Sequence, residues 1–343
     1  MRTDPVLGNQ SGLALVLTLL TISFLVAVTM QLMVTIDRQV TVSTMQREQA
    51  RLDAMVLAGL NLAQAALWTD QQDNEVDTTQ DLWAEFDPER LAALAGGLEL
   101  EIGVTDLSGR LQINALGASA TGKNPGGSVL KEQQETSTIR DVWLRFLTSG
   151  RFAVKDEEQA EALLDAIADW VDKDSSERIQ GAEEEYYRTR TPAYGCRNGK
   201  MSQVEELLRV KGMTTEIVYG DKEHEGIAEY VTVAGEDGKI NLNTAPLPVL
   251  LALSPDMTAE LVQELIDFRE DTGNKEELAS PDWYRKVNGM PATLTLDGAL
   301  LKVSGTHFRV AAKAVNHQFS RQGTGVVQRT ENKQLVLLSW QVE

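Results

Sequence analysis

The sequence is poor in the residues that build disulfide frameworks and zinc centres. Of its 343 residues, one is cysteine, Cys196, and three are histidine: His224, His307 and His317. One cysteine cannot form an intrachain disulfide, which excludes a disulfide-dense secreted scaffold. The histidines are scattered, and none forms the paired-histidine motif of a zinc metalloprotease helix. With no nucleophile, base and orienting group in a recognisable pattern, we expect no enzymatic activity.

Basic side chains are also scarce relative to acidic ones. The chain carries 32 Lys and Arg against 51 Asp and Glu, a formal net charge of -19. A surface of this sign repels the phosphates of nucleic acids and anionic lipid headgroups. We therefore expect no nucleic-acid partner, and the acidity favours solubility or cation binding.

One long stretch lacks charge altogether. Residues 13–34 form an apolar run behind a head that ends in Gly12. About 22 residues of α-helix suffice to cross roughly 30 Å of hydrocarbon. A cleaved secretory signal has a shorter core and a basic head, whereas this head carries only Arg2, offset by Asp4. The run is predicted to be a retained transmembrane helix, and charge alone leaves its orientation open.

A helical pattern continues beyond this run. Residues 35–68 contain neither proline nor a glycine pair, and apolar residues recur at spacings of seven and four. These residues are Met45, Leu52, Val56, Ala63 and Leu67. Such spacings fit one helical face. We expect one helix over 13–67, about 80 Å long at 1.5 Å per residue, whose first part lies in lipid and whose second packs on protein.

The strand signals lie at both ends of the remaining chain. Residues 98–105 alternate apolar and polar, and a turn leads to a second short strand over 110–114, which together predict a β-hairpin. Residues 308–315 and 334–342 read as further strands. Since a hairpin alone is not a stable sheet, we expect the C-terminal strands to complete it.

The middle of the chain is predicted to be helical. Residues 117–128 are rich in glycine and small residues and mark a boundary. Helical spacing follows over 138–147, 156–171 and 202–210, where Ser202 and Glu205 resemble a capping box. Our predicted divisions are a sheet segment over 69–116, an inserted helical domain over 117–235, a second helical module over 236–290 and closing strands over 291–343.

The second module opens on an echo of an earlier segment. Residues 237–243, DGKINLN, repeat the pattern of 108–114, SGRLQIN, which suggests a duplicated turn and strand before each helical module. Helices are predicted over 246–253 and 258–270.

This second module resembles the helix-hairpin-helix module of DNA-binding proteins over residues 241–269, and 202–218 form a looser copy. In that family glycines in the hairpin offer backbone N–H groups to phosphate. Here Pro255 removes a donor and Asp256 repels phosphate. We interpret the module as a scaffold that has lost its ligand and serves either protein contact or plain packing.

The most specific local pattern lies at residues 172–183. Asp172, Asp174, Ser176 and Glu183 occupy positions 1, 3, 5 and 12 of a calcium-binding EF-hand loop. Glu177 replaces the glycine that such a loop needs at its sixth position. We predict a calcium site with a different geometry, and the alternative is a solvated acidic linker.

Taken in order, several segments resemble the K-type minor pseudopilins of bacterial type II secretion. The resemblance rests on the apolar helix after Gly12 and on the motifs LSGRLQINAL, DAIADWVDKD, GAEEEYY, VEELLRVKGMT and GKINLNTAPLPVLLAL. It implies an α+β fold with a long N-terminal transmembrane, pilin-type helix and a small antiparallel pilin-like sheet. A large inserted all-helical domain with helix-hairpin-helix or SAM-like modules completes that fold.

The resemblance also implies processing. Prepilin peptidase would cleave between Gly12 and Leu13, which makes 1–12 a leader and places Leu17 at the fifth mature position. Most pilin-like proteins carry a glutamate there, thought to pair with the N-terminus of the subunit ahead, and K-type pseudopilins lack it. A subunit without this glutamate needs no predecessor, which suits the tip of a filament.

The implied function is initiation of the pseudopilus at its tip, for export of folded periplasmic proteins across the outer membrane. The expected partners are I-type and J-type minor pseudopilins, the major pseudopilin, prepilin peptidase and secreted substrates. The expected location is a Gram-negative inner membrane, single-pass, with the C-terminal domain in the periplasm. Family members are also expected to bind calcium in the helical domain, which supports Asp172, Asp174 and Glu183. The alternative is a membrane-anchored DNA-uptake receptor, which the charge and the altered hairpin disfavour.

Overall fold

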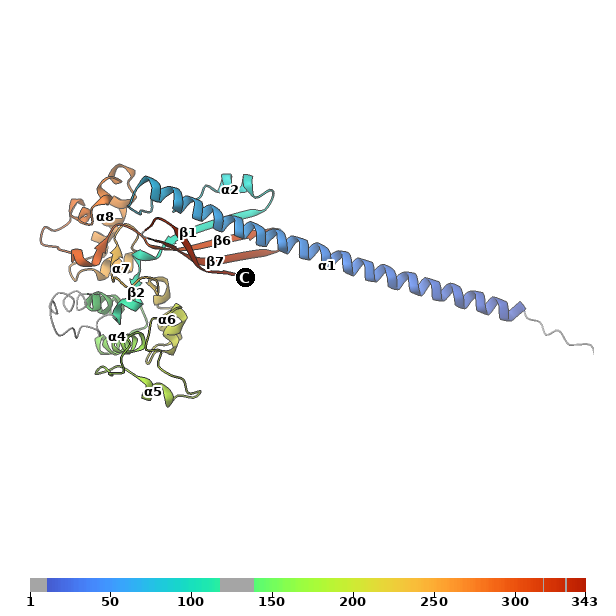
Figure 1. Cartoon of the computed structure of the whole chain (residues 1–343), viewed down its shortest axis with the longest axis horizontal. Coiled ribbons are helices and arrows are strands. Elements are labelled where there is room, and N and C mark those ends of the chain that lie inside the picture. The colour runs from blue at the N-terminus through green and yellow to red at the C-terminus, as the bar shows by residue number, and fades with distance from the viewer. Residues whose placement is uncertain (1–10, 118–138, 317, 331) are drawn as a thin grey trace, which may run out of the picture.

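A single long helix projects from a body of sheet and helices (Figure 1). The computed structural model describes residues 11–117, 139–316, 318–330 and 332–343. Helix α1, Ser11–Asp73, has 63 residues, about 95 Å at 1.5 Å per residue. It is the one described helix long and apolar enough to cross a membrane. The prediction of one continuous helix is confirmed, and α1 extends six residues beyond the predicted end at 67.

The second half of α1 buries one face against the sheet. Leu52, Val56, Ala63 and Leu67 of the predicted face are fully buried, whereas Met45 is 45% exposed because it precedes the body of the protein. A Cβ on Gly59 would lie 2.8 Å from the Cβ of Ala312 on the sheet. This glycine therefore allows a close approach of helix to sheet that a larger residue would block.

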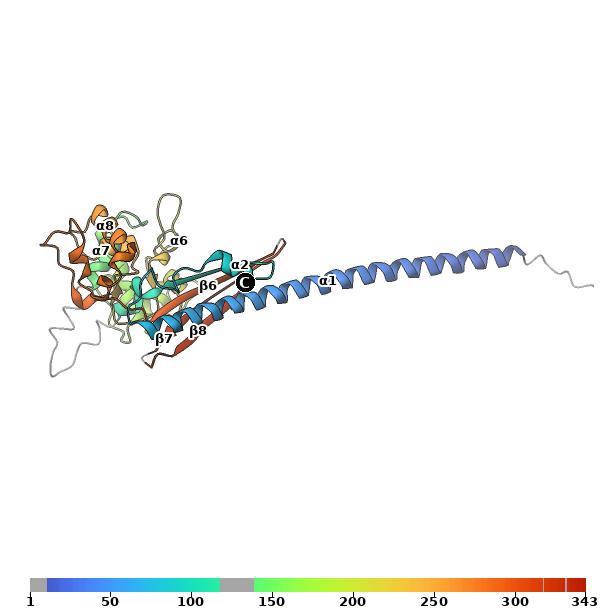
Figure 2. The same cartoon turned by 90° about the horizontal axis from the view of Figure 1, so that it is seen from above.

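The sheet has four antiparallel strands in the order β1-β6-β7-β8. Their bounds are β1 Glu99–Asp106, β6 His307–Val315, β7 Ser320–Arg329 and β8 Leu335–Val342. The strands run beside the C-terminal half of α1 (Figure 2). The expectation that C-terminal strands complete a sheet begun near residue 100 is confirmed, and so is the α+β fold class.

Strand β7 was not predicted, because glycines interrupt its apolar pattern. A Cβ on Gly323 would lie 2.3 Å from the indole of Trp340 and 2.6 Å from Val56. A Cβ on Gly325 would lie 2.2 Å from the carbonyl oxygen of Ser339. The glycines leave room for the Trp340 ring between β7 and α1, so neighbours rather than strand propensity hold β7 in place.

The predicted hairpin is wrong. Strand β2, Leu111–Gln112, does not pair with β1 but lies parallel to β3, Val231–Thr232. The chain leaves the sheet at the 3-10 helix η1, Leu107–Gly109, where Asp106 accepts a hydrogen bond from the Ser108 N–H at 2.8 Å. This cap redirects the chain away from the sheet at the point where a hairpin would have turned back.

A second parallel pair mirrors the first. Strand β4, Ile240–Asn241, lies parallel to β5, Leu301–Lys302. Strands β2 and β4 occupy the same place in the two echoing segments, and each has an asparagine two residues further on. Asn114 Nδ2 donates to the Val233 carbonyl at 2.7 Å, and Asn243 Nδ2 donates to the Val303 carbonyl at 3.5 Å. Each asparagine ties the opening strand of a helical module to the residue after its closing strand.

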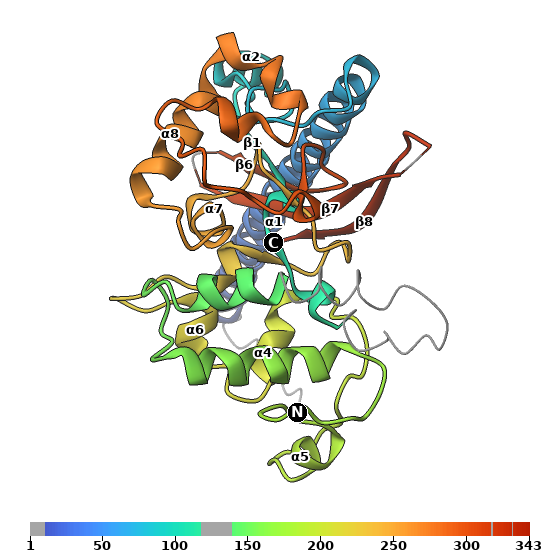
Figure 3. The ribbon, with the colours of Figure 1, turned by 90° about the vertical axis from the view of Figure 1, so that its left-hand side faces the viewer.

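The two helical modules share one hydrophobic core, and Figure 3 shows the first in green to yellow below the second in orange. The first contains a helix over 139–147, α4 Glu157–Val171, α5 Glu184–Arg188, η4 Val204–Arg209, α6 Thr215–Tyr219 and η5 Ile227–Glu229. The second contains α7 Leu247–Ala252, α8 Ala259–Glu270, η6 Thr272–Asn274, η7 Glu277–Ala279, η8 Trp283–Lys286 and η9 Gly298–Leu300. The 3-10 helix η2, Ile113–Leu116, follows β2 and packs on α4 in the first module, whereas α2, Pro88–Leu94, packs on β1 outside both modules.

The predicted capping box is displaced by one residue. Gln203 is the N-cap of η4 and pairs with Glu206, in place of the predicted Ser202 and Glu205. The Ser202 N–H and hydroxyl nevertheless both donate to the Glu206 carboxylate, at 2.9 and 2.8 Å.

A buried charged network joins the end of α1 and the segment after it to the sheet. Arg329, at the end of β7, pairs with Asp77 at 2.8 Å and with Asp70 at 3.3 Å. Asp77 also accepts a hydrogen bond from the Gly305 N–H at 2.7 Å. Burial raises the pKa of Asp70 to about 6; the charge of Asp81 adds to this shift and Arg329 opposes it.

Candidate functional site

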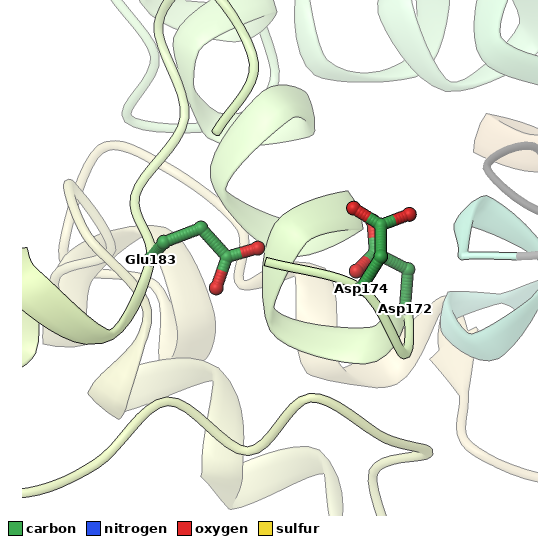
Figure 4. Close-up of side chains that lie close together, drawn as sticks. All are labelled: Asp172, Asp174 and Glu183. Carbon is green, nitrogen blue, oxygen red and sulfur yellow. The ribbon is translucent and has the colours of Figure 1, made fainter. Parts of the chain in front are cut away.

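Three acidic side chains converge beyond the C-terminal end of α4. Helix α4 ends at Val171, and Asp172 caps it, its N–H donating to the Ala168 carbonyl at 3.0 Å. Asp172, Asp174 and Glu183 each offer a carboxylate oxygen, and these oxygens all lie within 4.8 Å of one another. Glu183 faces the two aspartates from across the site (Figure 4). The structure therefore brings together three of the four predicted ligands.

The cluster is short of positive charge and of hydrogen-bond donors. Asp172 Oδ1 and both carboxylate oxygens of Glu183 are buried without a hydrogen-bond partner among the described residues. Burial raises the pKa of Glu183 to about 7, and the charges of Asp169 and Asp172 add to the shift. A buried carboxylate without a partner is costly, and a cation between the three groups would remove that cost.

One guanidinium compensates part of this charge. Arg178 Nη1 pairs with Asp172 Oδ2 at 2.7 Å and also with Asp169, whose side chain is fully buried. Burial raises the pKa of Asp172, and Arg178 opposes that shift. One guanidinium thus serves two of the carboxylates, while Asp172 Oδ1 and both oxygens of Glu183 remain for a cation. An all-oxygen acidic donor set fits calcium.

The loop does not have the arrangement of an EF-hand. Ser176 is exposed, and its N–H donates to Asp174 Oδ1 at 2.8 Å. Ile179, at the position that is apolar and packed in an EF-hand loop, is fully exposed. This agrees with the expectation drawn from Glu177 that the geometry differs from that family.

Asn198 is a candidate ligand that the sequence analysis missed. Its Oδ1 is buried without a hydrogen-bond partner in the part of the chain that the structure describes, while its Nδ2 donates to the Asp174 carbonyl at 2.9 Å. Its φ of +45 places it in the left-handed region, which asparagine tolerates better than most residues. An Asn-Gly pair such as that at 198–199 is a signal for a turn, but no spacing rule links it to a loop more than twenty residues away.

The predicted processing site lies at the start of α1. Leu13 and Leu17 are 68% and 55% exposed, and a Cβ on Gly12 would meet nothing within 4 Å. Residues 1–10 of the predicted leader lie outside the described residues. The bond between Gly12 and Leu13 is therefore free of tertiary packing from the described body.

Two family models match the chain. Both carry the description "Type II secretion system (T2SS), protein K", and they match residues 109–220 and 240–303, which together make up just over half of the chain. The two matches begin within the two echoing segments that open the helical modules.

Curated relatives show the same likeness over most of the chain. Type II secretion system protein K of Pseudomonas aeruginosa is 28% identical over 285 residues, 81% of this chain and 77% of that protein. The Klebsiella pneumoniae protein K is 27% identical over 77% of each chain, and the Aeromonas hydrophila protein K is 28% identical over 68% of each.

A solved structure shares the fold. A chain in the crystal structure of the GspK-GspI-GspJ complex from the type 2 secretion system of enterotoxigenic Escherichia coli aligns with a TM-score of 0.62. The alignment covers 88% of this chain and 99% of that one at 14% identity. At this identity the likeness concerns the fold alone.

Proposed function

This chain belongs to the type II secretion system protein K family, and on that premise we propose that it is the minor pseudopilin that initiates the pseudopilus at its tip. It would do so together with I-type and J-type minor pseudopilins. The observation that carries the proposal is the architecture: a long apolar α1 packed on a small antiparallel sheet, with helical modules inserted between β1 and β6. The related GspK-GspI-GspJ complex supports the choice of partners.

The absence of an acidic side chain near the start of α1 supports a position at the tip. Leu17 stands at the fifth position after the proposed cleavage site, and residues 13–34 carry no charge. An unpaired carboxylate within lipid costs several kcal/mol, so a glutamate there needs a partner on the subunit ahead. The first subunit of a filament has no such partner, and leucine avoids the cost.

We further propose that prepilin peptidase cleaves between Gly12 and Leu13 and that α1 anchors the mature chain in the inner membrane with its body in the periplasm. Mass spectrometry of the mature protein tests the first part, with Leu13 expected as the first residue. Gly12→Val should leave the leader attached. The major pseudopilin and secreted proteins complete the proposed set of partners.

Calcium is the proposed ligand of Asp172, Asp174 and Glu183. Bound there, the ion would supply the positive charge that these carboxylates lack and would fix the loop between α4 and α5. Asn198 is a further proposed ligand, and the Ser176 hydroxyl remains a predicted one.

The test of function is a clean deletion in the host. Exoproteins should accumulate, folded, in the periplasm while their export across the inner membrane continues, and the wild-type chain supplied in trans should restore their release. Normal release of exoproteins from the deletion strain would refute the proposal.

A further inference from the structure

The two edge strands of the sheet differ in how they are protected. Strand β1 carries Glu99, Glu101 and Asp106, and helix α2 packs against it. Strand β8, with the sequence LVLLSWQV, carries no charge, proline or glycine. Natural proteins usually protect edge strands with charge or cover, because an open edge invites pairing with another strand. Such protection is present at β1 and absent from the sequence of β8.

The side chains of β8 are unusually apolar for an exposed strand. Val336, Leu337, Leu338 and Val342 are 41, 41, 52 and 41% exposed. Trp340 turns inward and packs with the residues that α1 buries, which anchors the strand. A bulge between Val326 and Val327 of β7 leaves Leu338 without a partner in the ladder. The result is a firmly held strand with an apolar outer surface.

The hydrogen-bond register shows which backbone groups face outward. Gln322 on β7 and Glu343 exchange two hydrogen bonds, at 3.0 and 2.8 Å. In an antiparallel ladder, pairs that exchange such bonds alternate with pairs that do not. Val342 and Trp340 therefore direct their N–H and C=O groups away from β7. In the described residues no strand pairs with β8 on that side.

We propose that β8 is a docking edge that pairs, through main-chain hydrogen bonds, with an apolar strand of a neighbouring pseudopilin subunit. This mode of recognition gives affinity through the backbone and selects the partner through alternate side chains. On the face of the sheet away from α1, a cleft of about 430 Å³ borders β8, with Ser339 and Gln341 in its wall. Its wall continues across β7 to Arg309 of β6 and to Ser202 of the first helical module. The inference rests on the function proposed above.

Charge and composition favour a different subunit as the partner of β8 over a second copy of this chain or another segment of it. A second copy of the chain would bring its own net charge of -19 against the first, and repulsion at that level opposes self-pairing. Within the chain, residues 118–138 contain only Val129 and Leu130 as large apolar side chains, too few to match the apolar edge. The strand that pairs with β8 is therefore assigned to a different subunit, and we assign it to a subunit of the proposed tip complex.

The test uses a proline that removes an outward N–H. Val342→Pro deletes the donor that faces away from β7, whereas Val342→Thr keeps it with a side chain of similar shape. The full chain, in detergent, is titrated with the I-type and J-type subunits, each alone and both together. Val342→Pro should weaken the association by roughly tenfold and Val342→Thr by less than about twofold. Leu94→Ser, on α2 at the far side of the sheet, is the matched surface control and should bind as the wild type.

A second variant separates a loss of binding from a loss of folding. Leu338→Lys places a charge on the bulge without touching the ladder and should weaken the association while leaving the midpoint of thermal unfolding unchanged. Equal binding by Val342→Pro, Leu338→Lys and the wild type would overturn the inference, and so would failure of the wild type to bind either subunit. A wild-type dimer that Leu338→Lys dissociates would assign the edge to a second copy instead. If secretion fails in the deletion strain but both variants restore it fully, the docking edge is wrong and the proposed function stands.

Discussion

Replacing Glu183 with glutamine should change stability in opposite directions with and without calcium. In the metal-free chain, Glu183 and Asp172 are buried carboxylates with oxygens no more than 4.8 Å apart. At an effective dielectric constant of about 20, two unit charges at that distance repel by about 3.5 kcal/mol. Glu183→Gln removes one charge and keeps the shape, so at pH 8 in a chelator it should stabilise the fold by up to about 3 kcal/mol.

With calcium present the order should reverse. A ligand that binds only the folded state, at a thousand times its dissociation constant, stabilises by about 4 kcal/mol. At about 2 °C per kcal/mol this corresponds to an unfolding midpoint raised by roughly 8 °C in the wild type. Glu183→Gln and the pair Asp172→Ala with Asp174→Ala should lose most of this increment.

The assay is thermal unfolding of the full chain in detergent, followed by circular dichroism, in a chelator and then in millimolar calcium. Asp156→Asn is the matched control, since it removes a charge from the other end of α4 and keeps a residue able to cap the helix. An undiminished calcium increment in the double variant would place the site elsewhere. A metal-free Glu183→Gln chain less stable than the wild type would refute the repulsion argument itself.

Three further outcomes are expected. Because burial raises the pKa of Asp70 from 3.8 to about 6, the protonated side chain favours the fold below the lower value, and this contribution is lost as the pH rises through the higher one. Asp70→Asn should therefore reduce the fall in unfolding free energy between pH 4 and 7.5 by about 2 kcal/mol, measured by denaturant titration. Gly59→Leu should destabilise the fold by about 2 kcal/mol in urea unfolding, because its Cβ alone meets Ala312, while Ala65→Leu on the exposed face of α1 should change little. Leu17→Glu should reduce exoprotein release in a complementation assay, because a carboxylate without a partner would lie in the bilayer.

The sequence predicts well those elements in which one face is buried. The second half of α1 and strands β1 and β6 bury one face with a regular period, and each element was placed within a few residues, apart from the six-residue extension of α1. Strand β8 was placed equally well from its run of Val, Leu and Trp, although its residues do not alternate between buried and exposed. Strand β7 was missed since its place in the sheet depends on the Trp340 ring, a neighbour that no local pattern reveals.

The sequence also failed to predict which distant segments pair with each other. The hairpin prediction joined two adjacent strands, whereas β2 pairs with a strand about 120 residues further on. The acidic cluster was predicted because the spacing of Asp172, Asp174 and Glu183 within one loop is informative. Asn198 was not, because its approach to Asp174 depends on tertiary packing of the first helical module.

The separation of β1 from β6 has a kinetic consequence. Strand β1 ends at Asp106 and its neighbour β6 begins at His307, so the sheet cannot close until both helical modules have been synthesised. Contacts of such large sequence separation slow folding. During that interval β1 and the apolar face of α1 lack their partners in the sheet and stay open to other contacts. The hydrogen bonds of Asn114 and Asn243 hold the two ends of each folded module together. They therefore shorten the effective length of the loop between β1 and β6.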